Sequence, residues 1–95
     1  MVVGVLKLDL YLPGNNSLKG KRRILKGMLE RIIREFQVSA LEVGDGDLWQ
    51  RTQLGVAAAG RSRSQVTMKF QELRDWLEKN RQVEVINTEE EIIAL

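Results

Sequence analysis

Residues 2–36 have the sequence VVGVLKLDLYLPGNNSLKGKRRILKGMLERIIREF, and this stretch decides the fold. Apolar and polar residues alternate over most of residues 2–12, a pattern typical of a strand with one buried face. The face predicted to be buried carries Val2, Gly4, Leu6, Leu8, Leu10 and Leu12. A dense turn signal follows at residues 13–16, and Ser17 is suited to cap a helix. This first unit is therefore expected to be strand, turn and helix.

From residue 18 to residue 36 the apolar residues return at helical spacing. They form one stripe along the predicted helix: Leu18, Leu25, Met28, Leu29, Ile32 and Phe36. Gly20 and Gly27 lie opposite this stripe, so they lower the helix propensity without opening the core. The stripe predicts a helix that buries one face.

Two further strands are predicted after this helix. Residues 37–43 and residues 52–59 have strand-like patterns, and the turn residues 44–47 lie between them. Because these two strands are consecutive, we expect them to form a hairpin whose loop holds Leu48 and Trp49.

A second helix and a fourth strand complete the chain. Ser62 and Gln65 form a capping-box pattern, and Asn80 can end the helix. The buried face of this helix is expected to carry Val66, Phe70, Leu73 and Leu77, with Trp76 at its margin. Residues 82–86 predict a strand, and the tail from residue 89 to residue 95 fits either an extension of that strand after a bend or packing elsewhere.

The element order strand, helix, strand, strand, helix, strand predicts the fold class. Each strand–helix–strand unit favours a right-handed crossover between parallel strands. Two such units joined by a hairpin give an α+β ferredoxin-like βαββαβ fold, a four-stranded antiparallel sheet with both helices on one face. With 95 residues, we expect a single domain that spans residues 1–95.

The composition excludes several chemistries. The chain has no cysteine and no histidine, so disulfides, thiolate nucleophiles and cysteine-ligated zinc are excluded, and the commonest general base is missing. We therefore expect no enzymatic activity, no cofactor, no bound metal and no small-molecule substrate. No apolar run approaches the ~20 residues of a membrane span, and no signal-peptide pattern is visible. A cytoplasmic protein without membrane contact is expected.

The predicted first helix is strongly basic. Between residues 19 and 34 it carries seven basic residues and one acidic residue, a local charge of +6 in a chain whose net charge is +2. Basic side chains at the start of a helix are unfavourable because the helix dipole is positive there, and this suggests that they bind an anion. The residues predicted to bind RNA or another anion are Ser17, Lys19, Lys21, Arg22, Arg23, Lys26 and Arg34. The alternative is a solvated face whose long side chains cover the edge of the core.

The predicted hairpin holds two further candidate sites. The hairpin residues Trp49 and Arg51 could anchor an interface, but a large aromatic residue is usually buried, so we expect Trp49 to pack over the end of the core. The acids Glu42, Asp45 and Asp47 lack the remaining positions of a calcium loop, and a solvated hairpin is the preferred interpretation.

The sheet face that the helices leave open offers another surface. Val3, Val5 and Ala57 are predicted to share this face, and a mildly apolar open face favours self-association into a homodimer. Of the two central strands, only the first carries an aromatic residue, Tyr11, so base stacking on the sheet is disfavoured and RNA contact is expected from the helix side.

Four motifs resemble the bacterial YlxP-like family, in order and in spacing, over nearly the whole chain. They are Val2-Val3-Gly4-Val5, Ser17-Leu18-Lys19-x-Lys21-Arg22-Arg23, Val38-Ser39-x-x-Glu42-Val43 and Asp47-Leu48-Trp49-Gln50-Arg51-x-x-Leu54-Gly55-Val56-Ala57. Gly14 and Gly20 depart from it, because the family more often has larger residues there. The resemblance implies a ferredoxin-like fold without assigned catalytic residues. Genes of this family often neighbour genes for translation initiation and ribosome maturation, which implies a role with RNA or the ribosome.

These observations lead to two functional hypotheses. The first is a non-enzymatic accessory protein that binds RNA or a ribosomal particle through its basic first helix. The alternative is a protein–protein interaction module that dimerises through its open sheet face and binds no nucleic acid.

Overall fold

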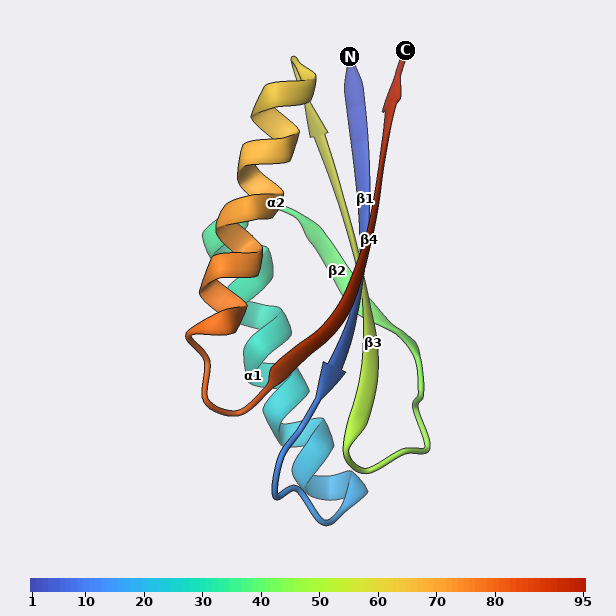
Figure 1. The fold of residues 1–95 in the computed structure, drawn as a ribbon, viewed down its shortest axis with the longest axis vertical. Helices are drawn as coiled ribbons and strands as arrows, with labels where there is room; N and C mark the ends of the chain where they lie inside the picture. The colour runs from blue at the N-terminus through green and yellow to red at the C-terminus, as the bar shows by residue number, and fades with distance from the viewer.

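Six elements follow one another in the predicted order. In a computed structural model of residues 1–95 they are β1 (Val2–Tyr11), α1 (Leu18–Phe36), β2 (Ser39–Gly44), β3 (Arg51–Gly60), α2 (Arg63–Glu78) and β4 (Glu84–Ala94). The four strands form one antiparallel sheet in the order β2-β3-β1-β4. Both helices cover the same face of this sheet (Figure 1). The structure confirms the ferredoxin-like α+β fold.

The core lies between the sheet and the two helices. The alternation of β1 is confirmed, because the face that carries Leu6, Leu8 and Leu10 is buried and Val5 and Lys7 on the other face are exposed. Strand β3 contributes Leu54, Val56 and Ala58 to the same core. The helices contribute Leu25, Met28 and Ile32 from α1, and Val66, Phe70, Leu73 and Leu77 from α2. Gly4 allows β1 and α2 to approach closely, because a Cβ atom at this position would overlap a methyl group of Val66.

Side chains cap both helices as predicted. The Ser17 hydroxyl accepts a hydrogen bond from the Gly20 backbone N–H at 2.9 Å, and the Ser62 hydroxyl accepts one from the Gln65 N–H at 3.2 Å. The Gln65 amide oxygen in turn accepts from the Arg61 N–H at 2.7 Å, one residue before the cap. At its other end, α1 stops because Gln37 adopts a left-handed conformation (φ 54°), so β2 begins at Ser39 rather than at residue 37.

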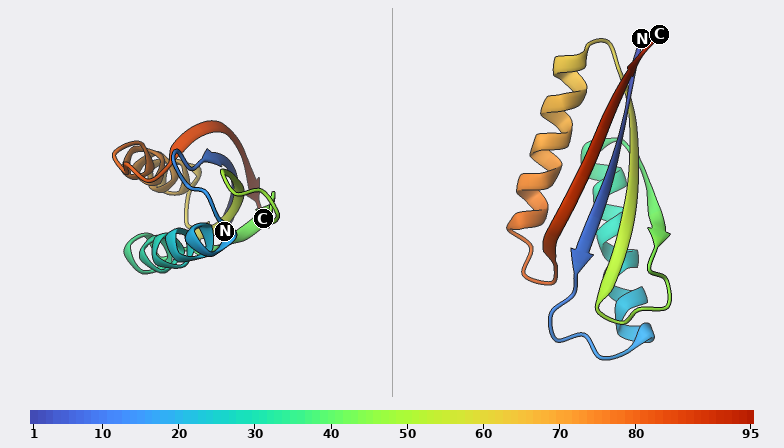
Figure 2. Two further views of the ribbon diagram at one scale, coloured as in Figure 1. Left: turned by 90° about the horizontal axis from the view of Figure 1, so that it is seen from below. Right: turned by 45° about the vertical axis from the view of Figure 1, so that its right-hand side comes forward.

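The tail extends the last strand. Strand β4 runs from Glu84 to Ala94 and pairs with the whole of β1. The register shifts once, opposite Asp9 and Leu10, where Ile86 is the extra residue of a β-bulge. The backbones of Met1 and Leu95 are hydrogen-bonded, so the two termini lie side by side (Figure 2). Of the two placements considered for the tail, the structure therefore adopts the strand extension after a bend.

Candidate nucleic-acid interface

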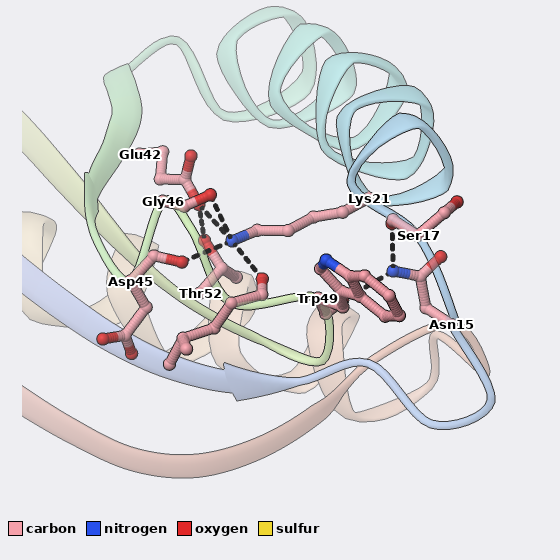
Figure 3. A network of polar contacts seen from close by, with 9 residues as sticks. Asn15, Ser17, Lys21, Glu42, Asp45, Gly46, Trp49 and Thr52 are labelled. Atoms are coloured by element: carbon pink, nitrogen blue, oxygen red, sulfur yellow. Dashed lines mark hydrogen bonds and ion pairs between the residues drawn. The ribbon is translucent and has the colours of Figure 1, made fainter.

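The side chain of Lys21 leaves the first turns of α1 and enters the protein, where only 1% of its surface is exposed. Its ammonium group meets four oxygen atoms around the β2–β3 loop (Figure 3): Asp45 O at 2.5 Å, Leu48 O at 2.8 Å, Glu42 Oε2 at 3.0 Å and Gly46 O at 3.4 Å. The Thr52 hydroxyl also donates to Glu42 Oε2, at 2.6 Å. Lys21 is thus fully engaged within the protein.

This geometry changes the set of residues available to an anion. Lys21 precedes Leu25 by four residues and Met28 by seven, so it continues the buried stripe of α1. Its ammonium group donates hydrogen bonds to carbonyl oxygens of the loop and is not available to an external anion. The hydroxyl of Ser17 is likewise occupied as the helix cap. We therefore leave Lys21 and Ser17 out of the proposed anion-binding surface and assign them structural roles. The spacing from Lys21 to the apolar stripe was the signal in the sequence for this burial.

Five basic side chains of α1 are both exposed and free of ion pairs. They are Lys19, Arg22, Arg23, Lys26 and Arg34, and none of them forms an ion pair with a carboxylate of the protein. Arg31, by contrast, pairs with Glu35 at 3.4 Å and lies over the Trp76 ring, 5.1 Å from its centroid. The five exposed residues, the basic face of α1, form a cationic surface whose charge the protein does not neutralise.

The β2–β3 loop is fastened to the start of α1. The Asn15 side-chain amide donates to Ser17 O at 2.8 Å and to Trp49 O at 2.5 Å, and the Gln50 amide donates to Asn15 O at 3.1 Å. Together with Lys21, these contacts bring the loop beside the first turn of the basic helix (Figure 3).

The expectation that Trp49 packs over the end of the core is wrong. The residue is 54% exposed, and its neighbours Leu48 and Arg51 are exposed as well. The loop that carries Trp49 is held by polar contacts of its backbone with Lys21 and Asn15 (Figure 3), and these contacts do not require the indole to pack.

The acids of the hairpin do not form a cation site. Glu42 faces the ammonium of Lys21, and the Asp45 backbone has a left-handed conformation (φ 60°) whose carbonyl accepts from the same lysine. No group of three or more acidic side chains comes together in a way that could hold a metal ion.

The sheet face opposite the helices carries several exposed apolar residues. The predicted residues Val3, Val5 and Ala57 are on this face, and Val5 is the most exposed of the three. Leu41 and Val43 on β2 are 56% and 50% exposed, and together with Val5 and Ala57 they line a hollow of about 450 Å³. Sequence reasoning missed these two residues, although their alternation with Glu42 was a signal that they share a face.

Fold and surface together define a small ferredoxin-like protein with a basic helix and an uncovered sheet face. Residues 3–90 match the family described as "Protein of unknown function (DUF503)". The chain is also 34% identical over 83 residues to the "Uncharacterized protein YlxP" of Bacillus subtilis (strain 168), across 87% of this chain and 90% of that one. The chain therefore belongs to the DUF503 family and is YlxP-like, which confirms the resemblance found in its motifs. Neither helix is apolar enough over a sufficient length to cross a membrane.

Proposed function

We propose that this protein is a non-enzymatic accessory protein that binds RNA or a ribosomal particle through the basic face of α1. One observation carries the proposal: Lys19, Arg22, Arg23, Lys26 and Arg34 are all exposed and unpaired on a single helix. A chain with a net charge of +2 has a weak overall field, so this local concentration is what would attract a polyanion.

The dimensions of the face suit a phosphate backbone. From Lys19 to Arg34 the helix advances roughly 20 Å, long enough to follow several phosphates of one strand. Acidic residues are sparse on this helix, and of its two glutamates Glu35 is already paired with Arg31. The proposal agrees with the role in translation or ribosome maturation that the family resemblance implies.

Cosedimentation with purified ribosomal subunits, and with ribosomal RNA freed of protein, tests this function across a series of salt concentrations. Binding through phosphates predicts that log affinity falls linearly with log salt, by about 0.7–0.9 for each phosphate neutralised. Absence of binding to either particle or RNA, even at the lowest salt concentration, would contradict the proposal.

A second candidate function rests on the open sheet face. Exposed Val5, Leu41 and Val43 surround the hollow, and the exposed ion pair of Lys7 and Glu89, 3.8 Å apart, provides charges of both signs at its margin. An apolar centre with a mixed charged rim is the composition of a homodimer interface, and a two-fold axis would place the same patch of both copies face to face. We infer that a second copy of this chain covers this face. The two proposals use different surfaces and are compatible.

A further inference from the structure

The exposed indole of Trp49 is the feature that the proposed function leaves unexplained. It is the one aromatic side chain among the exposed large apolar residues, while Trp76 is partly buried against Phe36 and Arg31. Exposure of tryptophan to water is unfavourable because its ring has a large apolar surface, and a partner that covers the ring removes this cost.

The backbone that carries Trp49 is held in place on both sides of the indole. Trp49 O accepts from the Asn15 amide, and the preceding carbonyl, Leu48 O, accepts from the buried ammonium of Lys21 at 2.8 Å. A turn bond from the Leu48 N–H to Asp45 O at 3.1 Å closes the loop. An aromatic ring on so constrained a backbone loses little conformational freedom when a ligand covers it, so it is organised for binding in advance.

The backbone that carries this ring is joined to the first turn of α1, where the basic face begins. The Asn15 side chain that binds Trp49 also lies against Gly20, since a Cβ atom there would come within 2.4 Å of Asn15 Oδ1. The turns of α1 around Gly20 carry Lys19, Arg22 and Arg23, all exposed and unpaired. The indole therefore lies at the end of the molecule where the basic face of α1 begins.

We propose that Trp49 stacks on an unpaired base of the RNA that the basic face of α1 holds by its phosphates. The inference rests on the proposed function and narrows its ligand to RNA with a single-stranded loop, bulge or end. In a continuous duplex the base faces are stacked on one another, whereas unpaired bases are free to stack on aromatic side chains. The charge of the neighbouring helix favours a nucleic acid over a neutral apolar partner.

The test compares a single-stranded oligoadenylate with a duplex RNA of equal length, using Trp49→Ala, Trp49→Phe and, as a matched control in the same loop, Leu48→Ala. Because Trp49 and Leu48 are both exposed, all three variants should keep the wild-type melting temperature. We expect Trp49→Ala to weaken single-strand binding by about 5- to 150-fold. Duplex binding and the salt slope should not change, Trp49→Phe should retain most of the affinity, and Leu48→Ala should bind as wild type does.

Fluorescence gives a second and direct readout. In a Trp76→Phe background Trp49 is the single tryptophan, and oligoadenylate should quench its emission in proportion to binding. If Trp49→Ala binds the single strand as wild type does and the emission is unaffected, the stacking inference is overturned while salt-dependent RNA binding still stands. If no RNA binds under any condition, the proposed function fails as well. A change in oligomeric state for Trp49→Ala, with RNA binding intact, would identify the indole as a protein contact and overturn the inference.

Discussion

The ammonium of Lys21 lies 3.0 Å from a carboxylate oxygen of Glu42, so an ion pair joins α1 to β2 beneath the β2–β3 loop. The lysine is buried, whereas the glutamate keeps part of its side chain in contact with solvent. The same ammonium group, which can only donate hydrogen bonds, also donates to the backbone carbonyls of Asp45 and Leu48. One side chain of the basic helix thus organises the loop that presents Trp49.

Lys21→Met tests this structural role, because methionine keeps the apolar stem and removes the charge. The change would leave the carbonyls of Asp45 and Leu48 without this donor, and the Glu42 carboxylate would lose its ion pair and keep only the Thr52 hydroxyl. Removal of one partner from a fully buried pair costs about 3–5 kcal/mol, and because Glu42 is partly exposed we expect a loss of about 2–4 kcal/mol in the free energy of unfolding. Urea denaturation measures this loss.

Lys19→Met is the matched control, since Lys19 is exposed in the same helix and forms no ion pair. Its free energy of unfolding should stay within about 0.5 kcal/mol of wild type. Equal stabilities of the Lys21 and Lys19 variants would show that the amine contributes nothing to the fold.

Two glycine substitutions should have opposite effects on stability. At Gly4 a methyl group would overlap side chains of Val66 and Phe70 on α2, so Gly4→Ala should cost about 1–3 kcal/mol. At Gly27 a methyl group would meet nothing within 4 Å, and alanine favours the helix, so Gly27→Ala should gain about 0.5–1 kcal/mol. Urea unfolding of both proteins decides the point, and a neutral Gly4→Ala would mean that α2 can move away from β1 at little cost.

The parts of the fold that depend on local periodicity could be predicted from the sequence. The alternation of β1 and the apolar stripe of α1 each fix which face is buried, and together with the element order they determine the topology. The helix caps at Ser17 and Ser62 are local as well, because donor and acceptor are three residues apart. These predictions needed no knowledge of distant contacts.

The site was harder to predict because it depends on contacts between distant residues. A lysine is normally placed in solvent, and what permits the burial of Lys21 is a set of carbonyls 24 to 27 residues further along the chain. That same network holds the backbone of the loop on which Trp49 is exposed, so both differences from expectation concern one set of long-range contacts. The bulge at Ile86, which lets the tail follow β1, likewise depends on pairing between the two ends of the chain.

The open sheet face should support a dimer that a single charge disrupts. Val5→Lys places an ammonium within the apolar patch, while Glu91 directly opposite on β4 offers it a partner within the fold. We therefore expect the folded monomer to persist and the dimer to dissociate, as measured by sedimentation velocity. Thr67→Lys, on the exposed surface of α2, adds the same charge elsewhere and should leave the dimer intact. A wild-type protein that is monomeric at tens of micromolar, roughly the range of a modest interface, would exclude this candidate.

The basic face of α1 makes a quantitative prediction about salt. Arg23→Gln with Lys26→Gln removes two exposed, unpaired charges, so the slope of log affinity against log salt for ribosomal particles or RNA should fall by about one to two units. Sequence preference should not change, because phosphate contacts carry no base information. Stability should change by less than about 0.5 kcal/mol, since neither side chain belongs to the core.

A control with the same loss of charge separates a local surface from the net charge of the molecule. Arg61→Gln with Arg63→Gln also removes two exposed and unpaired arginines, but at the start of α2, which lies at the opposite end of the molecule from the start of α1 (Figure 1). If the basic face of α1 is the binding surface, this variant should keep the wild-type slope within experimental error. Equal reductions in both double variants would mean that RNA responds only to net charge. Wild-type binding by the α1 variant at every salt concentration would mean that its basic face is merely solvated, and the dimerising module would then become the leading function.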